Sequence, residues 1–319
     1  MNGYPARMPG VPPARFAYLG PRGTFTEAAL RTLPAADHAV LLPQESSVAA
    51  IEAVRGGDAD HAVVPLENSV EGSVVSVLDE LACGDPLVIT REIFLPVGFS
   101  LLARAGTTMA DIRTVATHPH AEAQCRRWLT EHLPAARVEP AGSTAAGAAM
   151  VARGERDAAV CAPIAARHYR LQELATDVAD NPGAVTRFVL LSRPGQPPAP
   201  TGNDKSSLVA FIRDDHTGAL LEVLTEFAVR GINLTRIESR PTKERLGRYC
   251  FSLDCEGHLA DARVADALAA LRRRCADVRY LGSYPRADGE PKPVPDPARD
   301  EAFNDAAAWL DRIRSGATG

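Results

Sequence analysis

The sequence predicts an α/β protein in two parts, a larger strand–helix part followed by a smaller ferredoxin-like part. From Phe16 onward, short apolar runs alternate with stretches whose apolar residues recur every three or four positions, the pattern of strands followed by amphipathic helices. The strand-like runs lie at 16–20, 38–44, 61–69, 114–118, 137–142, 158–163 and 187–193. A Pro- and Gly-rich segment at 194–204 has no apolar period and is predicted to be the linker between the parts.

Two stretches of the larger part carry further expectations. The third strand-like run is followed by an amphipathic pattern that predicts a helix over 70–81. The segment 86–106 is rich in Val, Ile and Phe without a helical period, so it interrupts the alternation as β structure. We therefore expect a short leader over 1–15 and one α/β domain over 16–193.

The smaller part reads as strand, helix, strand, strand, helix and strand over 205–286, which is the ferredoxin-like βαββαβ order. Its first helix is expected to end at Gly231, a residue suited to the left-handed conformation. One face of that helix is expected to carry Leu220, Leu224, Phe227 and Ala228. The tail, 287–319, is predicted to hold one short helix around 302–313 and is assigned no function.

Composition narrows the classes of partner. The chain has 319 residues and a formal net charge of −5, with its basic residues scattered apart from the run 272–274. That distribution lacks the cationic patch of a nucleic-acid-binding protein. No apolar run has the length of a signal peptide or of a membrane helix, which needs about 20 residues. We expect a cytoplasmic protein that binds neither nucleic acid nor membrane.

Metal and nucleotide cofactors are disfavoured by spacing. Cys250 and Cys255 are five residues apart in a strand-like segment, which directs them to opposite faces, and the cysteines are expected to be buried free thiols. His118 and His120 flank a proline without further ligands at metal-site spacing, so they are interpreted as polar residues at a helix start. The chain has neither the third glycine of a dinucleotide fingerprint nor a phosphate-binding loop motif.

Three predicted strand-to-helix turns carry small polar residues. Thr24 has Glu27 three residues on, Asn68 has Glu71 at the same offset, and Ser143 with Thr144 follows Gly142. Each alone is explained as a helix N-cap contributing about 1 kcal/mol. Because the carboxyl ends of strands in an open α/β sheet meet at one edge, these helix starts are expected to converge on a crevice that suits an anion.

A fourth turn brings Thr186, Arg187 and Phe188 to the start of a strand. A strand threonine, a surface arginine and a core phenylalanine are the structural alternatives. Arg187 offers the planar, bidentate donor fork that a carboxylate prefers, which favours a role in the crevice. Spacing alone does not name a reaction.

The chain resembles the prephenate dehydratase family from about Phe16 to Arg286. Five segments carry the likeness in the first part, in the family's order: 20–30, 64–74, 118–125, 143–149 and 185–188. Two more, GALL at 218–221 and ESRP at 238–241, resemble the phenylalanine-responsive motifs of the ACT domain. Relatives often differ at His120, Glu122, Gly183 and Ala184, so these positions receive no role.

The resemblance implies a two-lobed catalytic domain similar to periplasmic binding proteins, with the active site between the lobes. It implies conversion of prephenate to phenylpyruvate with loss of CO2 and water, and an essential threonine at Thr186. Phe188 is expected either to face charge developing on the ring or to be a core residue. The substrate's carboxylates are expected to be held by Thr24, Asn68, Ser69, Ser143, Thr144 and Arg187. The short leader leaves no room for a preceding chorismate mutase domain, so a monofunctional enzyme is expected.

The ACT motifs imply control by L-phenylalanine bound at a subunit interface of a homodimer or homotetramer. The residues expected to respond are Gly218, Ala219, Leu220, Leu221, Asn233, Glu238, Ser239, Arg240 and Pro241. The alternative is that this domain only mediates dimerisation and binds no effector. Two alternatives for the whole chain stay open, an arogenate dehydratase and a non-enzymatic carboxylate sensor.

Overall fold

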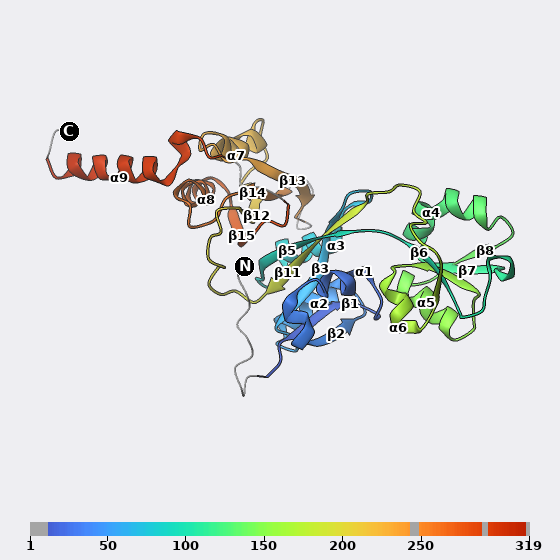
Figure 1. Ribbon diagram of the computed structural model, residues 1–319. Helices are drawn as coiled ribbons and strands as arrows, with labels where there is room; N and C mark the ends of the chain where they lie inside the picture. The colour runs from blue at the N-terminus through green and yellow to red at the C-terminus, as the bar shows by residue number, and fades with distance from the viewer. Residues whose placement is uncertain (1–11, 243–248, 289–292, 317–319) are drawn as a thin grey trace. The chain divides into compact units, whose positions relative to one another are not determined.

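The strand–helix alternation of the larger part is present in the computed structural model, which describes residues 12–242, 249–288 and 293–316 (Figure 1). Most of the expected leader lies outside these residues. The chain divides into two compact units: unit one runs up to Val77 and resumes over Ile93–Leu191, and unit two combines Leu78–Glu92 with the chain from Ser192 onward. Unit one itself contains two lobes, each built on its own sheet.

The first lobe is a mixed sheet in which β1 pairs in parallel with strands on both sides. Its strands, in spatial order, are β2 (Val40–Gln44), β1 (Arg15–Leu19), β3 (His61–Asn68), β11 (Val185–Ser192) and β5 (Val88–Pro96), with β4 (Gly72–Ser73) paired to β3. Its helical segments are α1 (Phe25–Leu30), η1 (Pro34–His38), α2 (Ser47–Arg55) and α3 (Val75–Cys83). Phe16, Tyr18 and Leu30 are fully buried in its core.

The second lobe has a five-stranded sheet. Its order is β10 (Gln172–Ala175), β6 (Ser100–Ala103), β9 (Ala158–Cys161), β7 (Thr114–Thr117) and β8 (Arg137–Pro140). The helical segments are η2 (Met109–Asp111), α4 (Pro119–His132), α5 (Thr144–Ala152) and α6 (Ile164–Tyr169). Leu101, Val115 and Val160 are fully buried in its core.

The chain passes from the first sheet to the second after β5 and returns to the first as β11. The β-rich segment predicted over 86–106 is this outward crossing, which explains why it breaks the strand–helix rhythm. Because β11 inserts between β3 and β5, its first residues stand beside the end of β3. The last strand of the domain is thereby placed next to an early one.

The helix predicted over 70–81 begins later, at Val75. Residues 68–72 instead form the turn of a hairpin in which Asn68 of β3 opposes Gly72 of β4. Gly72 has a φ of +83° and therefore supplies the left-handed residue of this turn. The prediction that Asn68 caps a helix is wrong, because its side chain caps a turn.

Unit two contains the βαββαβ domain, whose predicted order is confirmed. Its elements are β12 (Asp204–Phe211), α7 (Ala219–Ala228), β13 (Leu234–Pro241), β14 (Tyr249–Glu256), α8 (Ala262–Arg274) and β15 (Asp277–Pro285). The sheet order is β13-β14-β12-β15, so β13 is an edge strand. The tail contains η3 (Asp296–Ala298) and α9 (Asp300–Arg314), which confirms the short helix predicted there.

The buried face of α7 differs from the predicted one. Ala219, Val223 and Phe227 are buried, whereas Leu220 is 39% exposed and Ala228 is also exposed. Phe227 is buried as predicted, but the other buried residues, Ala219 and Val223, precede the predicted Leu220 and Leu224 by one position, so the inward stripe is rotated by about one residue from the expected stripe. Gly231 has a φ of +62°, as expected for the residue that ends this helical region.

One segment predicted to belong wholly to the larger domain, Leu78–Glu92, packs in unit two. Glu92 on β5 and Lys205 on β12 form a buried ion pair at 2.9 Å. Asp79 on α3 pairs with Arg240 on β13 at 3.0 Å. Helix α3 and strand β5 are therefore each shared between the two units along the chain.

Gly282 lies where β15 packs closely on β5 within unit two. Its φ is +129°, and a Cβ at this position would stand 2.3 Å from the carbonyl oxygen of Ile89. That neighbour is backbone and cannot swing away, so close packing of β15 on β5 requires glycine.

We expect Gly282→Ala to lower the free energy of unfolding by about 3 kcal/mol, because backbone strain and a backbone clash add. Gly202→Ala is the matched control, since Gly202 also has a positive φ of +81° but has no atom within 4 Å of the place that a Cβ would occupy. The control should lose about 1 kcal/mol. Urea unfolding followed by circular dichroism measures both, and equal losses would contradict the packing role of Gly282.

Candidate active site

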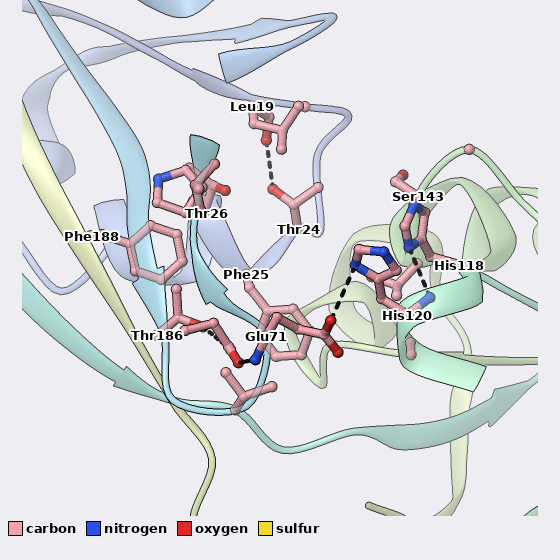
Figure 2. A pocket seen from close by; sticks show the side chains of 18 of the residues that line it. Leu19, Thr24, Phe25, Thr26, Glu71, His118, His120, Ser143, Thr186 and Phe188 are labelled. Atoms are coloured by element: carbon pink, nitrogen blue, oxygen red, sulfur yellow. Dashed lines mark hydrogen bonds and ion pairs between the residues drawn. The ribbon is translucent and has the colours of Figure 1, made fainter. Parts of the chain in front are cut away.

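A cavity of about 910 Å³ lies between the two lobes of unit one. The first lobe contributes strand ends, the start of α1 and the β3–β4 hairpin, and the second contributes the starts of α4 and α5 (Figure 2). The polar lining residues are Thr24, Thr26, Gln44, Glu45, Asn68, Glu71, Ser73, His118, His120, Gln124, Ser143, Thr144 and Thr186. The predicted convergence of strand ends on one crevice is thus present in the structure.

Thr186 stands in this cavity with its hydroxyl held by Asn68. The Nδ2 of Asn68 donates to Thr186 Oγ1 at 2.8 Å, and Thr186 is only 7% exposed. The bond joins β3 to β11, two neighbouring strands that are far apart in the sequence. With its oxygen already accepting from Asn68, the Thr186 hydroxyl keeps its proton for another acceptor.

The orientation of the Asn68 amide follows from its other contacts. Its Oδ1 accepts hydrogen bonds from the backbone N–H groups of Val70 and Glu71, at 2.8 and 3.0 Å. Two donors at one end require the carbonyl oxygen there, so the amino group must face Thr186. The hairpin turn therefore determines which group Thr186 meets.

Arg187 does not line the cavity, which corrects its predicted role as a direct carboxylate ligand. Side chains alternate along a strand, and in β11 the cavity is lined by Thr186 and Phe188. Arg187 points to the other face of the sheet and is 5% exposed. Phe188 is buried in the core of the first lobe, which is one of its two expected roles, and it also lines the cavity. Its contact with charge on the substrate's ring stays a prediction.

Ser69 is also absent from the described lining, which corrects its prediction as a substrate ligand. Its Oγ accepts from the backbone N–H of Val185 at 3.0 Å, and its own N–H donates to the Val185 carbonyl at 2.9 Å. These bonds fasten the hairpin to the start of β11. Ser69 supports the position of Thr186 and does not reach the cavity.

Thr24 lines the cavity as the N-cap of α1. Its Oγ1 accepts from the Glu27 N–H at 3.2 Å and donates to the Leu19 carbonyl at 2.8 Å. The Glu27 carboxylate returns to the N–H of Gly23 at 2.7 Å. The predicted cap is confirmed, and the Thr24 proton is committed to the backbone, so its hydroxyl can only accept further bonds.

Ser143 and Thr144 line the cavity from the second lobe at the start of α5. Ser143 is the N-cap, and its Oγ accepts from the Ala146 N–H at 3.0 Å. Thr144 occupies the first helical position and also lines the cavity. This end of α5 presents a partial positive charge to the cavity.

Glu71, Gln124 and His120 also line the cavity, although no sequence pattern assigned them a role there. The Nε2 of Gln124 donates to Glu71 Oε1 at 3.0 Å, which bridges the hairpin of the first lobe and α4 of the second. His120 Nδ1 lies 4.0 Å from Glu71 Oε2. Figure 2 marks this contact with a dashed line. The strand-end rule applied to β7 is the signal that could have found the histidine, because α4 begins directly after that strand.

His118 is the N-cap of α4, which confirms the interpretation of this histidine as a helix-start residue. Its Nδ1 accepts from the N–H of His120 at 3.3 Å. Burial, followed by the nearby His120, lowers the pKa of His118 below its ordinary value. Both observations describe a neutral imidazole with its proton on Nε2.

The described residues contain no group of three or more His, Cys, Asp or Glu side chains placed to hold a metal ion. Five of the cysteines are buried, as predicted, but Cys83 is exposed. Burial raises the pKa of the Cys125 thiol to about 12. In the ranges the structure covers, no helix is both long and apolar enough to cross a bilayer.

The predicted effector residues lie in unit two. Gly218 has a φ of +97° directly before α7, and Leu220 and Leu221 are 39% and 66% exposed. Asn233 lines a separate cavity of about 600 Å³. The motif 238–241 lies on the edge strand β13, where Arg240 pairs with Asp79.

Comparison with known proteins agrees with this geometry. Residues 16–196 match the family model for prephenate dehydratase, and residues 207–273 match that for the ACT domain. A prephenate dehydratase of Amycolatopsis methanolica is 55% identical, covering 95% of this chain and 99% of that protein. The fold and the interlobe cavity define a two-lobed lyase with a C-terminal ACT domain. The chain belongs to the prephenate dehydratase family.

Two solved structures extend the comparison. The prephenate dehydratase of Arthrobacter aurescens in complex with L-Phe has a TM-score of 0.90 and 50% identity, covering 95% of this chain and 100% of that chain. A structure described as GqqA, a novel type of quorum quenching acylases, has a TM-score of 0.76 and 32% identity, covering 86% and 98%. The two-lobed α/β and ACT fold class predicted from the sequence is confirmed.

Proposed function

We propose that this chain converts prephenate to phenylpyruvate with loss of CO2 and water, a step in L-phenylalanine biosynthesis. The observation that carries the proposal is the hydroxyl of Thr186, held in the cavity by Asn68 at 2.8 Å with its proton free to donate. The family assignment supplies the substrate class. Neither arogenate dehydration nor a sensor without catalysis finds support among the relatives' names.

The reaction needs an oriented donor more than a strong acid. As the carbon–carbon bond to the ring carboxylate breaks, its electron pair enters the ring and the ring hydroxyl leaves with a proton as water, which creates an aromatic ring. Thr186 donates a hydrogen bond to that hydroxyl as negative charge develops on its oxygen. A threonine proton is held too tightly for efficient transfer near neutral pH, so Thr186 stabilises the leaving oxygen or relays a proton.

Helix starts supply part of the binding of the substrate's carboxylates. The start of α5, with Ser143 and Thr144, is directed at the cavity opposite Thr186. Val97, Phe99 and Phe188 give the cavity an apolar wall suited to the substrate's ring. The cavity therefore offers a polar end for anions and an apolar wall for a six-membered ring.

Thr186→Val should lower kcat for phenylpyruvate formation by two to three decades, or about 3 to 4 kcal/mol of barrier, because a preorganised donor is lost. Thr186→Ser keeps the hydroxyl and should retain most of the rate. Single-turnover assays with prephenate, with binding measured separately, make the comparison. Near-wild-type kcat in the valine variant would sink the catalytic assignment of Thr186.

Asn68→Asp tests whether Asn68 acts through Thr186. The variant still accepts from the N–H groups of Val70 and Glu71 but presents an acceptor to Thr186, whose proton should turn away from the substrate. We expect kcat to fall on the order of 100-fold. In a Thr186→Val background the same change should add little to the loss. Additive losses in the double variant would show that Asn68 acts on the substrate independently.

Regulation by L-phenylalanine is the second part of the proposal. The ACT domain match and the L-Phe complex of the Arthrobacter aurescens relative support it. The edge strand β13 and the exposed Leu220 and Leu221 offer a surface on which a second copy can pack, as expected for a homodimer or homotetramer. The alternative in which the domain only dimerises predicts no effector binding.

Isothermal calorimetry of the full chain should show heat on titration with L-phenylalanine and a parallel change in turnover of prephenate. Asn233→Ala should weaken that binding tenfold or more, because Asn233 belongs to the predicted effector residues and lines a cavity of unit two. Asn304→Ala, at another exposed asparagine, is the control and should bind as the wild type does. If the wild type shows neither heat nor a change in activity, the domain does not bind L-phenylalanine and only mediates dimerisation.

A further inference from the structure

The charges that line the cavity do not match the proposed substrate, and this mismatch points to a further residue that binds it. Prephenate is a dianion, yet the described lining residues include the carboxylates of Glu45 and Glu71 and no lysine or arginine. Since Arg187 faces away, His118 and His120 are the lining side chains that can carry positive charge. Any role for them in substrate binding rests on the proposed function.

His118 is committed to another task. Its Nδ1 must be unprotonated to accept the His120 N–H, and burial lowers its pKa. Protonating it would remove the cap of α4. Positive charge at this wall of the cavity therefore falls to His120.

The start of α4 cannot bind an anion through its backbone. Pro119 has no N–H, the His120 N–H donates to His118 Nδ1, and the N–H groups of Ala121 and Glu122 donate to the His118 carbonyl at 2.9 and 3.0 Å. Each donor of the first turn is thus used. In contrast to α5, this helix can meet a carboxylate only through a side chain.

His120 is placed to supply that side chain. It lies at the second position of α4 with 69% of its side chain exposed, and its ring stands edge-on to that of His118 with centroids 5.0 Å apart. The charged or titratable groups facing it are Glu71, 4.0 Å away, and His118. Gln124 fixes Glu71 from the same helix, so the carboxylate is held beside the imidazole ring of His120.

We propose that His120, as an imidazolium held beside Glu71, binds a carboxylate of the substrate from the second lobe while Thr186 acts from the first. Its protonation makes substrate binding depend on pH. Binding is strong where His120 is charged and weakens as pH rises and the imidazolium loses its proton.

The test is the pH profile of KM and kcat for prephenate between pH 6 and 8.5, with an enzyme-free blank at each pH. For the wild type we expect KM to rise at least fivefold across this range. His120→Gln keeps a hydrogen-bond donor at an exposed helix position, and its KM should be constant and equal to the wild-type value at high pH, with kcat changed less than threefold. A wild-type pH profile in His120→Gln would overturn the proposal while leaving the proposed function intact.

Glu71→Gln tests whether His120 binds the substrate or only contacts Glu71 and so holds the two lobes together. If His120 binds substrate, the rise of KM with pH persists in this variant, because the imidazole still meets the substrate's carboxylate. If Glu71→Gln instead flattens the profile as His120→Gln does, His120 serves Glu71 alone and the proposal fails. No turnover of prephenate by the wild type at any pH would remove the proposed function itself.

Discussion

The hydrogen bond from Asn68 to Thr186 is the constraint on which the candidate active site depends. It requires β11 beside β3, the hairpin that holds the Asn68 carbonyl oxygen, and the Ser69–Val185 contacts that fasten the hairpin to β11. Together these features fix the position and the orientation of the Thr186 hydroxyl. Preorganisation of this kind is effective because the donor does not have to reorient as charge develops on the leaving oxygen. The strand order and the hairpin of the first lobe together orient the hydroxyl proton of Thr186.

In the proposed reaction the same cavity binds a dianion without a lining guanidinium or ammonium among its described residues. Its positive potential comes from the start of α5 and, in our proposal, from a histidine held by a carboxylate. Neutral donors and partial charges bind an anion less strongly than an arginine fork, but they also release it more readily. A decarboxylation discharges one carboxylate as CO2, so a fixed guanidinium there would stabilise the substrate's charge that the reaction has to remove.

Local patterns in the sequence predict much of this architecture, because helix caps and strand periodicity depend on neighbours along the chain. Thr24 and Ser143 are caps as expected, and apolar periods alone predict the βαββαβ order. The prediction for Asn68 fails because Asn with Glu three residues later fits both a helix start and a hairpin turn. The prediction for Arg187 fails because a tripeptide does not show which face of the strand each residue takes. The roles of Glu71 and His120 depend on the two lobes facing each other, because one residue lies in each lobe. A local sequence pattern cannot show such a contact.

The two units also share elements that no boundary in the sequence reveals. Val74 lines the cavity, Val75 begins α3, and Asp79 on the same helix pairs with Arg240 of the predicted effector motif. On β5, Glu92 is buried against Lys205 of the ACT domain, while the strand continues into the first sheet. A buried ion pair is costly to break by removing one partner, about 3 to 5 kcal/mol, so this pair holds the Glu92 part of β5 firmly within unit two. Helix α3 and strand β5 therefore each cross a unit boundary along the chain, which no local pattern of apolar residues indicates.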